Sequence, residues 1–302
     1  ALREHGGMPR IGMIHQPTLP PETLTDLARR AEAAGVEEVW VWEDCFKQSG
    51  LAPLIAALAS TERLRVGVGI LPMPLRNPAL AAMEIATVER LYPGRAIFGF
   101  GHGVLDWMGQ AGARVASPLT LMREYVPALR RLLAGDEVTT SGRYVRLDRV
   151  KLAWPPERTV PMLAAGEGPK TLSLTGEVAD GTVLTAGSSP AMVRSAVARI
   201  HGAREAAGRT GPHEIVVFLM CAFGDTASAL EAEFDAWGFS GERRFAASGD
   251  DAAVAEAIAA LTDAGATSVI LQPLSHDADL APYAAATARV TAIVRAAEPP
   301  RP

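Results

Sequence analysis

The feature that most constrains this chain is a repeated phrase: an amphipathic helix, a glycine stop and a short apolar strand. At 21–42 the helix PETLTDLARRAEAAG is followed by the strand EEVWVW, and the phrase returns at 252–272 as AAVAEAIAALTDAGATSVILQ. A shortened copy, TLSLTGEVADGTVLTAG, occupies 171–187. Because a short turn cannot return a chain to a parallel start, strands separated by helices predict a parallel sheet.

Five further apolar runs bring the number of predicted strands to eight. These runs are RIGMIH (10–15), LRVGVGIL (64–71), RAIFGFG (95–101), VPMLAAG (160–166) and EIVVFLMCAF (214–223). Eight strand and helix units in 302 residues predict an α/β fold of the (β/α)8 TIM-barrel type. A doubly wound sheet is the alternative, but small residues in the middle strands favour a crowded barrel interior: Gly67, Gly69, Gly99 and Gly101.

One connection is too long for a plain barrel. Residues 102–159, after the fourth strand, contain a predicted helix at about 118–134 and a predicted hairpin at TTSGRYVRLDRVKL (139–152). We expect this insertion to cover the functional site. The chain is otherwise expected to form a single domain over 1–302, with residues 1–8 as a flexible leader.

Composition excludes several classes of partner. The formal net charge of −5 leaves no basic face for nucleic acid or an anionic membrane, which favours a small-molecule substrate. No apolar run approaches the ~20 residues that cross a bilayer. The two cysteines, Cys45 and Cys221, are far apart in sequence, which favours a reducing, cytoplasmic location. The six histidines lack metal-site spacing, so no metal is expected.

In a barrel of this type chemistry occurs at the carboxyl ends of the strands, so the residues that end each strand are informative. The second strand ends in two adjacent carboxylates, Glu43 and Asp44, and the first ends in His15. The carboxylates therefore point to the barrel mouth, where one either caps the next helix or contacts a ligand. Two neighbouring carboxylates there also tend to separate in proton affinity.

The segment AAGEGPKT (164–171) indicates an anion site. A glycine turn leaves the fifth strand, and Pro169 is suited to the first position of a helix, with Lys170 and Thr171 just inside it. Free backbone N–H groups, a positive helix end, a cation and a hydroxyl would then meet, which suits a phosphate. Alternatively, the turn simply begins a helix and Lys170 points into solvent.

A third candidate segment is GFGHGVLDWMGQAG (99–112). Gly101 and Gly103 on both sides of His102 allow a planar ligand to approach the backbone, and the imidazole can exchange protons near neutral pH. Trp107 and Met108 could form an apolar wall. The alternative is that His102 pairs with a neighbouring carbonyl and that Trp107 and Met108 belong to the core.

The run LRVGVGILPMPLRNPALAAMEIATVERLYPGRAIFGFGHG, preceded by VWVWEDCF and followed by VPMLAAGEGPKTLSLTGEVADGTVLTAG, resembles the bacterial luciferase-like (LLM) superfamily of flavin- and deazaflavin-dependent oxidoreductases. It is most similar to the branch of methylenetetrahydromethanopterin reductase, whose coenzyme is the deazaflavin F420. The resemblance extends from about residue 10 to 200, and only the α/β rhythm supports it beyond 200.

The resemblance implies a barrel that holds an isoalloxazine-type ring at its mouth, with the phosphate near the fifth strand. It also implies a non-proline cis peptide at the end of the third strand, at Gly69–Ile70 or its neighbour. The expected cofactor-binding residues are His15, Gly69, Ile70, Leu71, Gly101, Gly103, Gly166, Glu167, Gly168, Pro169, Lys170, Thr171 and Thr185. The expected substrate pocket contains Trp42, Trp107 and Met108.

One departure from the family concerns catalysis. Relatives that use F420 often have Asp-His where this chain has Glu43-Asp44, so the family histidine role does not transfer to Asp44. Either His102 or His15 would then handle the proton. The expected catalytic residues are Glu43 as acid/base or ring-polarising group, Asp44 and His102. The same departure leaves FMN open as an alternative to F420.

The resulting prediction is hydride transfer between reduced F420 and a small unsaturated organic substrate. One alternative is an FMN-dependent monooxygenase, which uses reduced flavin and oxygen. A second is a non-catalytic barrel that retains the fold and binds a ligand. A homodimer is the family expectation, and the Ala-rich helices near 77–92 and 282–297 are candidates for its interface.

Overall fold

The computed structural model describes residues 8–224, 226–275, 277 and 279–297. Within them, eight strands form a ring in which every neighbouring pair is parallel. The ring is closed because the last strand pairs with the first. The ring runs β1 (Arg10–Ile14), β2 (Glu38–Val41), β3 (Arg65–Pro72), β4 (Ala96–Gly101), β7 (Met162–Ala165), β8 (Gly181–Leu184), β9 (Glu214–Phe223) and β11 (Ser268–Gln272). The predicted barrel and its eight strands are confirmed. Of the leader expected at 1–8, residues 1–7 lie outside the described residues.

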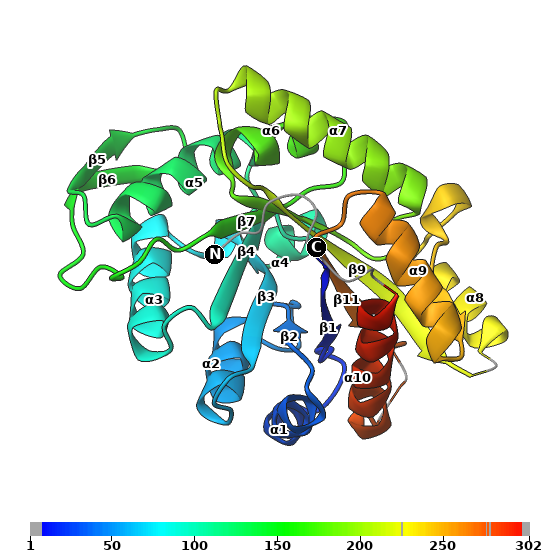
Figure 1. The fold of residues 1–302 in the computed structure, drawn as a ribbon. Helices are drawn as coiled ribbons and strands as arrows, with labels where there is room; N and C mark the ends of the chain where they lie inside the picture. Colours follow the sequence, from blue (N-terminus) through cyan, green and yellow to red (C-terminus); the bar gives the residue numbers. More distant parts are fainter. Residues whose placement is uncertain (1–7, 225, 276, 278, 298–302) are drawn as a thin grey trace, which may run out of the picture.

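Helices surround the ring (Figure 1). They include α1 (Leu24–Ala34), α2 (Leu51–Ala59), α3 (Pro78–Leu91), α6 (Pro169–Val178), α7 (Pro190–Ala206), α9 (Asp251–Asp263) and α10 (Ala281–Ala296), with short 3-10 turns η1 (Pro21–Thr23) before α1 and η2 (Met73–Leu75) after β3. The glycine stops work as predicted. Gly35 follows α1 with a φ of 85°, and Gly265 follows α9 with a φ of 109°, a region that favours glycine.

The barrel interior is crowded around Trp40 and Phe218. The two rings meet edge to face with centroids 5.7 Å apart. A Cβ at Gly67 would lie 2.3 Å from the Trp40 indole, and a Cβ at Gly69 would lie 2.8 Å from the tip of Phe218. The glycines of β3 are therefore needed to admit two large aromatic side chains to the interior.

A buried ion cluster closes the amino ends of the strands, opposite the mouth. The Glu38 carboxylate accepts hydrogen bonds from Arg10 Nε at 2.6 Å and from Arg65 at 2.7 Å, and Trp40 Nε1 donates to it at 2.9 Å. Arg10 also pairs with Glu214. These charges neutralise one another, which a buried cluster requires.

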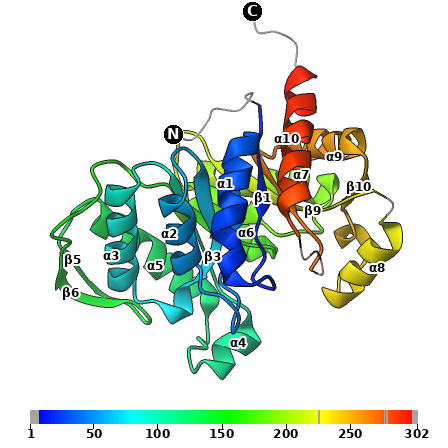
Figure 2. The same ribbon diagram turned by 90° about the horizontal axis from the view of Figure 1, so that it is seen from below.

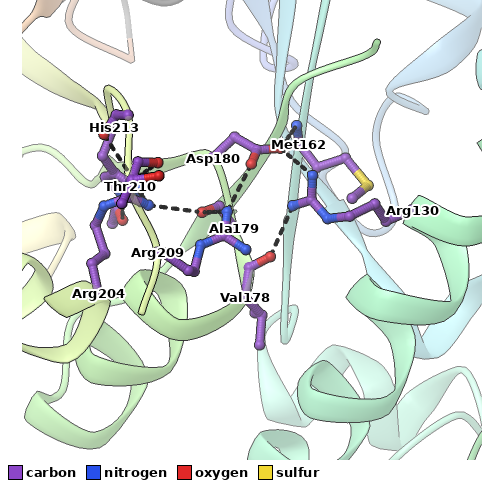
Figure 3. Close-up of polar contacts among 11 residues, drawn as sticks. Arg130, Met162, Val178, Ala179, Asp180, Arg204, Arg209, Thr210 and His213 are labelled. Atoms are coloured by element: carbon purple, nitrogen blue, oxygen red, sulfur yellow. Dashed lines mark hydrogen bonds and ion pairs between the residues drawn. The ribbon is translucent and has the colours of Figure 1, made fainter. Parts of the chain in front are cut away.

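A second polar network ties helix α5 (Pro118–Leu133) and the loop after α7 to the same end of the barrel (Figure 3). Asp180, just before β8, accepts hydrogen bonds from Arg130 at 2.9 Å, from Arg209 at 2.8 Å and from the Met162 backbone N–H at 3.0 Å. Arg209 also donates to the carbonyl of Ala179. One carboxylate thus joins α5, the end of α7 and the start of β7.

The insertion after β4 contains α4 (Leu105–Gln110), α5 (Pro118–Leu133) and the antiparallel hairpin β5 (Val138–Ser141) with β6 (Arg146–Val150). The predicted helix and hairpin are confirmed. The expectation that the insertion covers the site is wrong for most of its length. Figure 2 shows α4 projecting beyond the barrel end, whereas the hairpin lies at the side near α3 and α5. The hairpin buries Val138 and Leu147 in the core outside the ring.

A further excursion, which the sequence reading did not recognise, follows β9. It contains α8 (Ala227–Ala236), η3 (Gly241–Arg243) and β10 (Ala247–Gly249), which pairs in parallel with β9 outside the ring. The described helices include none long and apolar enough to cross a bilayer.

Candidate active site

A cavity of about 510 Å³ opens at the carboxyl ends of the strands. The predicted residues that line it are Trp42, Glu43, Asp44, Gly69, Ile70, Gly101, His102, Gly103, Trp107, Gly166, Glu167, Gly168, Thr171 and Thr185. Pro72, Val104, Ala165, Ala186, Phe218, Trp237, Phe239 and Gln272 line it as well. Its size is typical of a pocket for a small organic ligand.

The two carboxylates after β2 have different surroundings. Arg76 donates to both oxygens of Glu43, at 2.6 and 2.8 Å, and the Gly50 backbone N–H adds a third hydrogen bond at 3.0 Å. Such a fork-to-fork ion pair fixes the position and orientation of the carboxylate. Glu43 therefore borders the cavity as a paired group, which does not favour the acid/base role predicted for it.

Asp44 retains capacity for a ligand. Lys47 donates to its Oδ2 at 3.0 Å, while Oδ1 is buried and has no hydrogen-bond partner among the described residues. A buried acceptor without a partner is uncommon in folded proteins, and a bound ligand is one way to satisfy it.

His102 is the second lining residue whose buried polar atoms have no hydrogen-bond partner in the described residues. Both ring nitrogens are buried, and neither has a hydrogen-bond partner in the described part of the chain. Burial lowers the pKa of His102 below its ordinary value, because the charged imidazolium is poorly solvated there. The neutral ring can donate one hydrogen bond and accept another at the barrel mouth.

The sequence predicted an anion site after the fifth strand. At this place the structure has the start of α6, which no side chain caps, and an ion pair beside it. Gly168 caps α6 without a side-chain hydrogen bond, and a Cβ placed on it would meet no described atom within 4 Å. Glu167 accepts hydrogen bonds from Thr185 and from Arg243. Although burial acts to raise the pKa of Glu167, hydrogen bonds from Arg243 and Thr185 hold it below its usual range.

Aromatic side chains form the rest of the wall. Trp42 stacks on Phe218 with centroids 6.4 Å apart and planes at 27°. Trp237 and Phe239, from the excursion after β9, stack at 6.1 Å and 28°. Trp107 of α4 lines the cavity too. Flat apolar faces of this kind suit a planar ligand.

Five predicted site residues do not line the cavity. His15 lies outside the ring, because Ile14 before it points into the interior and side chains alternate along a strand; its Nε2 is 2.9 Å from Thr23 Oγ1. Leu71 packs in the core outside the ring together with Val68, because the register of β3 shifts between these two residues. Met108 is buried beneath Gly103.

Pro169 and Lys170 are the other two predicted residues outside the lining. Both are exposed in the first turn of α6, and neither lines the cavity. The solvent-facing alternative for Lys170 is the one observed. The Gly69–Ile70 peptide bond is cis, as the family resemblance implied, and Cys45–Phe46 is also cis.

Sequence reasoning missed Arg76, Arg243, Phe218, Trp237 and Phe239. Arg76 and Arg243 are arginines among many, and their carboxylate partners are 33 and 76 residues away in the sequence. The sequence did contain a signal for the excursion: the segment between the seventh strand of the ring and the helix at 251 is long and contains four aromatic residues, Phe234, Trp237, Phe239 and Phe245.

Comparison with known proteins gives the family. The family model described as luciferase-like monooxygenase matches residues 8–242. This chain belongs to the luciferase-like monooxygenase family. The family resemblance expected from the sequence is thereby confirmed, and the match extends beyond residue 200 into the excursion that supplies Trp237 and Phe239.

Two curated relatives of this luciferase-like protein are oxidoreductases, and one of them is named for F420. This protein is 30% identical to the 5,10-methylenetetrahydromethanopterin reductase of Methanolobus tindarius over 74% of this chain and 68% of the relative. It is 32% identical to the F420-dependent glucose-6-phosphate dehydrogenase of Kineococcus radiotolerans over 70% of this chain and 67% of the relative.

A solved structure extends the likeness to the whole fold. An F420-dependent secondary alcohol dehydrogenase in complex with an F420–acetone adduct superposes with a TM-score of 0.84, covering 96% of this chain and all (100%) of that one. At 23% identity this likeness shows the luciferase-like fold.

A tricyclic coenzyme with a phosphate fits the cavity of this luciferase-like protein. The aromatic walls suit the ring, and the open end of α6 beside Arg243 suits the phosphate. Asp44 Oδ1 and the two ring nitrogens of His102 are buried polar atoms that lack partners within the described residues and line the place where a ring would lie.

Proposed function

We propose that this chain is an F420-dependent oxidoreductase that transfers a hydride between the reduced coenzyme and a small unsaturated organic substrate. The observation that carries the proposal is the cavity, which has stacked aromatic walls, a helix end without a side-chain cap, and buried polar atoms of Asp44 and His102 without partners in the described structure. The relative that is named for F420 supports the choice of coenzyme.

The bound coenzyme would supply a hydride donor of fixed stereochemistry at the mouth. This chain would position the coenzyme and the substrate, and it would supply the proton. The amides at the start of α6, Thr171 and Arg243 would hold the phosphate end. Trp42 and Phe218 would form one face of the site.

His102 is our choice for the proton-handling group. Burial lowers the pKa of His102, so its protonated ring would be a strong proton donor to the reduced substrate and would take a replacement proton from solvent. Asp44 Oδ1 would accept a hydrogen bond from the ring or the substrate. Glu43 would act through its ion pair with Arg76, which holds the loop after β2 against the end of β3.

An FMN-dependent monooxygenase is the second candidate, because the matching family is described by that activity. Titration with F420 and FMN, each followed by absorbance, tests both. F420 should bind at micromolar concentration, and turnover should consume no oxygen. Tighter binding of FMN together with oxygen uptake would identify the protein as an FMN-dependent monooxygenase. No spectral change with either coenzyme would favour the non-catalytic, ligand-binding barrel.

We also propose that the protein forms a homodimer through α3. Leu80 and Met83 lie three residues apart on one helix face and are 43% and 54% exposed. Light scattering after gel filtration tests this, and Met83→Glu should shift a dimer to a monomer. With Cys45 and Cys221 both free, a reducing cytoplasmic location is consistent with the chemistry.

A further inference from the structure

The Glu167 carboxylate takes up the hydrogen-bond donors that an anion would use at the start of α6. Arg243 donates to it from both terminal nitrogens, at 2.6 and 3.2 Å, and the Thr185 hydroxyl donates to it as well. Glu167 directly precedes Gly168, which caps α6 without a side-chain hydrogen bond. A guanidinium and a hydroxyl beside a helix start suit a phosphate. Part of that position is therefore filled by a carboxylate of the chain itself.

The same carboxylate screens Arg243 from the cavity. Glu167 and Thr185 line the cavity, whereas Arg243 is not among its described lining residues. The Arg243 guanidinium lies over the Phe239 ring, 4.6 Å from the ring centroid, and donates to the Ala186 carbonyl at 3.4 Å. Because these contacts hold the guanidinium in place, an anion in the cavity reaches its terminal nitrogens only where Glu167 withdraws.

Glu167 is free to withdraw. Its side chain is 52% exposed, against 29% for Arg243, so water can solvate the carboxylate once it leaves the pair. Ion pairs this close to solvent contribute little to stability. A Cβ placed on the neighbouring Gly168 would meet no described atom within 4 Å, which shows open space next to Glu167.

Arg243 would gain hydrogen bonds by the exchange. Its Nε is buried and has no hydrogen-bond partner within the described residues, so the carboxylate satisfies the guanidinium only in part. A carboxylate presents two oxygens, whereas a phosphate group presents more acceptor oxygens to the same donors. The site therefore favours a phosphate over the carboxylate that fills it.

We infer that Glu167 is an autoinhibitory carboxylate, which engages Arg243 and Thr185 until the phosphate of the coenzyme displaces it. This inference rests on the proposed function and names a regulation of the same site. The apparent affinity for a ligand is reduced by the fraction of molecules whose site is free to bind it. Glu167 thus lowers the affinity for the coenzyme, although its partner Arg243 raises it.

The substitution Glu167→Gln tests this, because glutamine removes the negative charge and keeps the size of the side chain. Fluorescence titration should show at least fivefold tighter binding of F420, and calorimetry should show a similar gain for inorganic phosphate. The same deazaflavin without its phosphate should bind the variant and the wild-type protein equally. Glu167→Ala should reproduce the gain for F420.

Glu177→Gln is the matched control. Glu177 lies near the other end of α6, pairs with Arg123 at 3.3 Å and does not line the cavity. It carries the same charge on the same helix, so this variant separates a local exchange from a change in net charge. Its affinity for F420 should equal that of the wild-type protein, and a gain as large as that of Glu167→Gln would contradict the inference.

The outcomes separate the inference from the proposed function. Equal or weaker F420 binding by Glu167→Gln overturns the inference and makes Glu167 a residue that orients Arg243 for the phosphate. An equal gain for the deazaflavin without phosphate overturns it too. If no protein binds F420, the proposed function fails, and the phosphate titration decides the inference: a fivefold gain supports the exchange at Arg243, and no gain overturns it.

Discussion

Arg243 donates from both terminal nitrogens to the carboxylate of Glu167, at 2.6 and 3.2 Å, and joins two loops that are 76 residues apart in the sequence. Its second terminal nitrogen also donates to Thr185 at 3.1 Å. Without this arginine, an acidic residue would stand alone at the site where a coenzyme phosphate is proposed to bind. The pair thus converts a repulsive position into one that accepts an anion.

Arg243→Ala should therefore weaken F420 binding by roughly tenfold to a hundredfold, since about 1.4 kcal/mol corresponds to each factor of ten. The same deazaflavin without its phosphate should lose little affinity, because it has no charge to be repelled. Fluorescence titration of both compounds checks this. The double variant Arg243→Ala, Glu167→Gln should recover part of the loss, and equal losses for both compounds would refute the role.

Glu43→Gln should primarily affect folding. The substitution leaves Arg76 half-buried with one of its two carboxylate partners lost, and we expect a loss of about 2–4 kcal/mol in the free energy of unfolding. Urea denaturation measures it. Glu84→Gln is the control, because Glu84 contacts Arg76 at 3.3 Å, and it should cost under about 1 kcal/mol. Full stability of Glu43→Gln with abolished turnover would instead restore Glu43 as a catalytic group.

His102→Gln should lower turnover by about a hundredfold or more, the usual contribution of a positioned acid/base group. Coenzyme affinity should change far less. In the wild-type protein, turnover should decrease as the pH rises above the pKa of His102, which burial places below its ordinary value, because the ring must carry the proton that the reduced substrate takes up. A variant with unchanged turnover and an unchanged pH profile would remove His102 from the mechanism.

Stability should fall on mild acidification because of His15. Burial lowers the pKa of His15 from 6.5 to about 4. Between these values the unfolded chain binds a proton that the folded chain does not, so the free energy of unfolding decreases as the pH falls through this window. The loss is at most about 1.4 kcal/mol per pKa unit. His15→Gln should flatten the dependence measured by urea denaturation at pH 7 and pH 5.

Asp180→Ala should destabilise the amino end of the barrel, because it leaves Arg130, Arg209 and the Met162 amide without their shared acceptor. We expect a loss of about 3 kcal/mol in the free energy of unfolding, measured by denaturant. Asp136 pairs with Arg131 where both are 52% exposed, and Asp136→Ala should cost under about 1 kcal/mol. Similar costs for the two variants would contradict this account.

The barrel and the position of its mouth could be predicted from the sequence because they depend on local patterns. The helix, glycine and strand phrase sets parallel pairing, and each strand's last residues then identify Glu43, His102 and Gly166 as neighbours of one cavity. Fourteen of the nineteen predicted site residues line that cavity. Those that do not, such as His15 and Leu71, depend on which way a side chain faces where a strand ends, and one residue of register reverses it.

Tertiary structure alone decided which polar groups are free. Glu43 and Asp44 are adjacent in the sequence, yet Arg76 engages both oxygens of Glu43 while Asp44 keeps one oxygen without a partner in the described residues. Likewise, a distant loop brings Arg243 to Glu167 and two aromatic rings to the mouth. The physical reason is that strand and helix periods are read from neighbouring residues, whereas ion pairs and cavity walls form between segments whose separation in the chain carries no local signal.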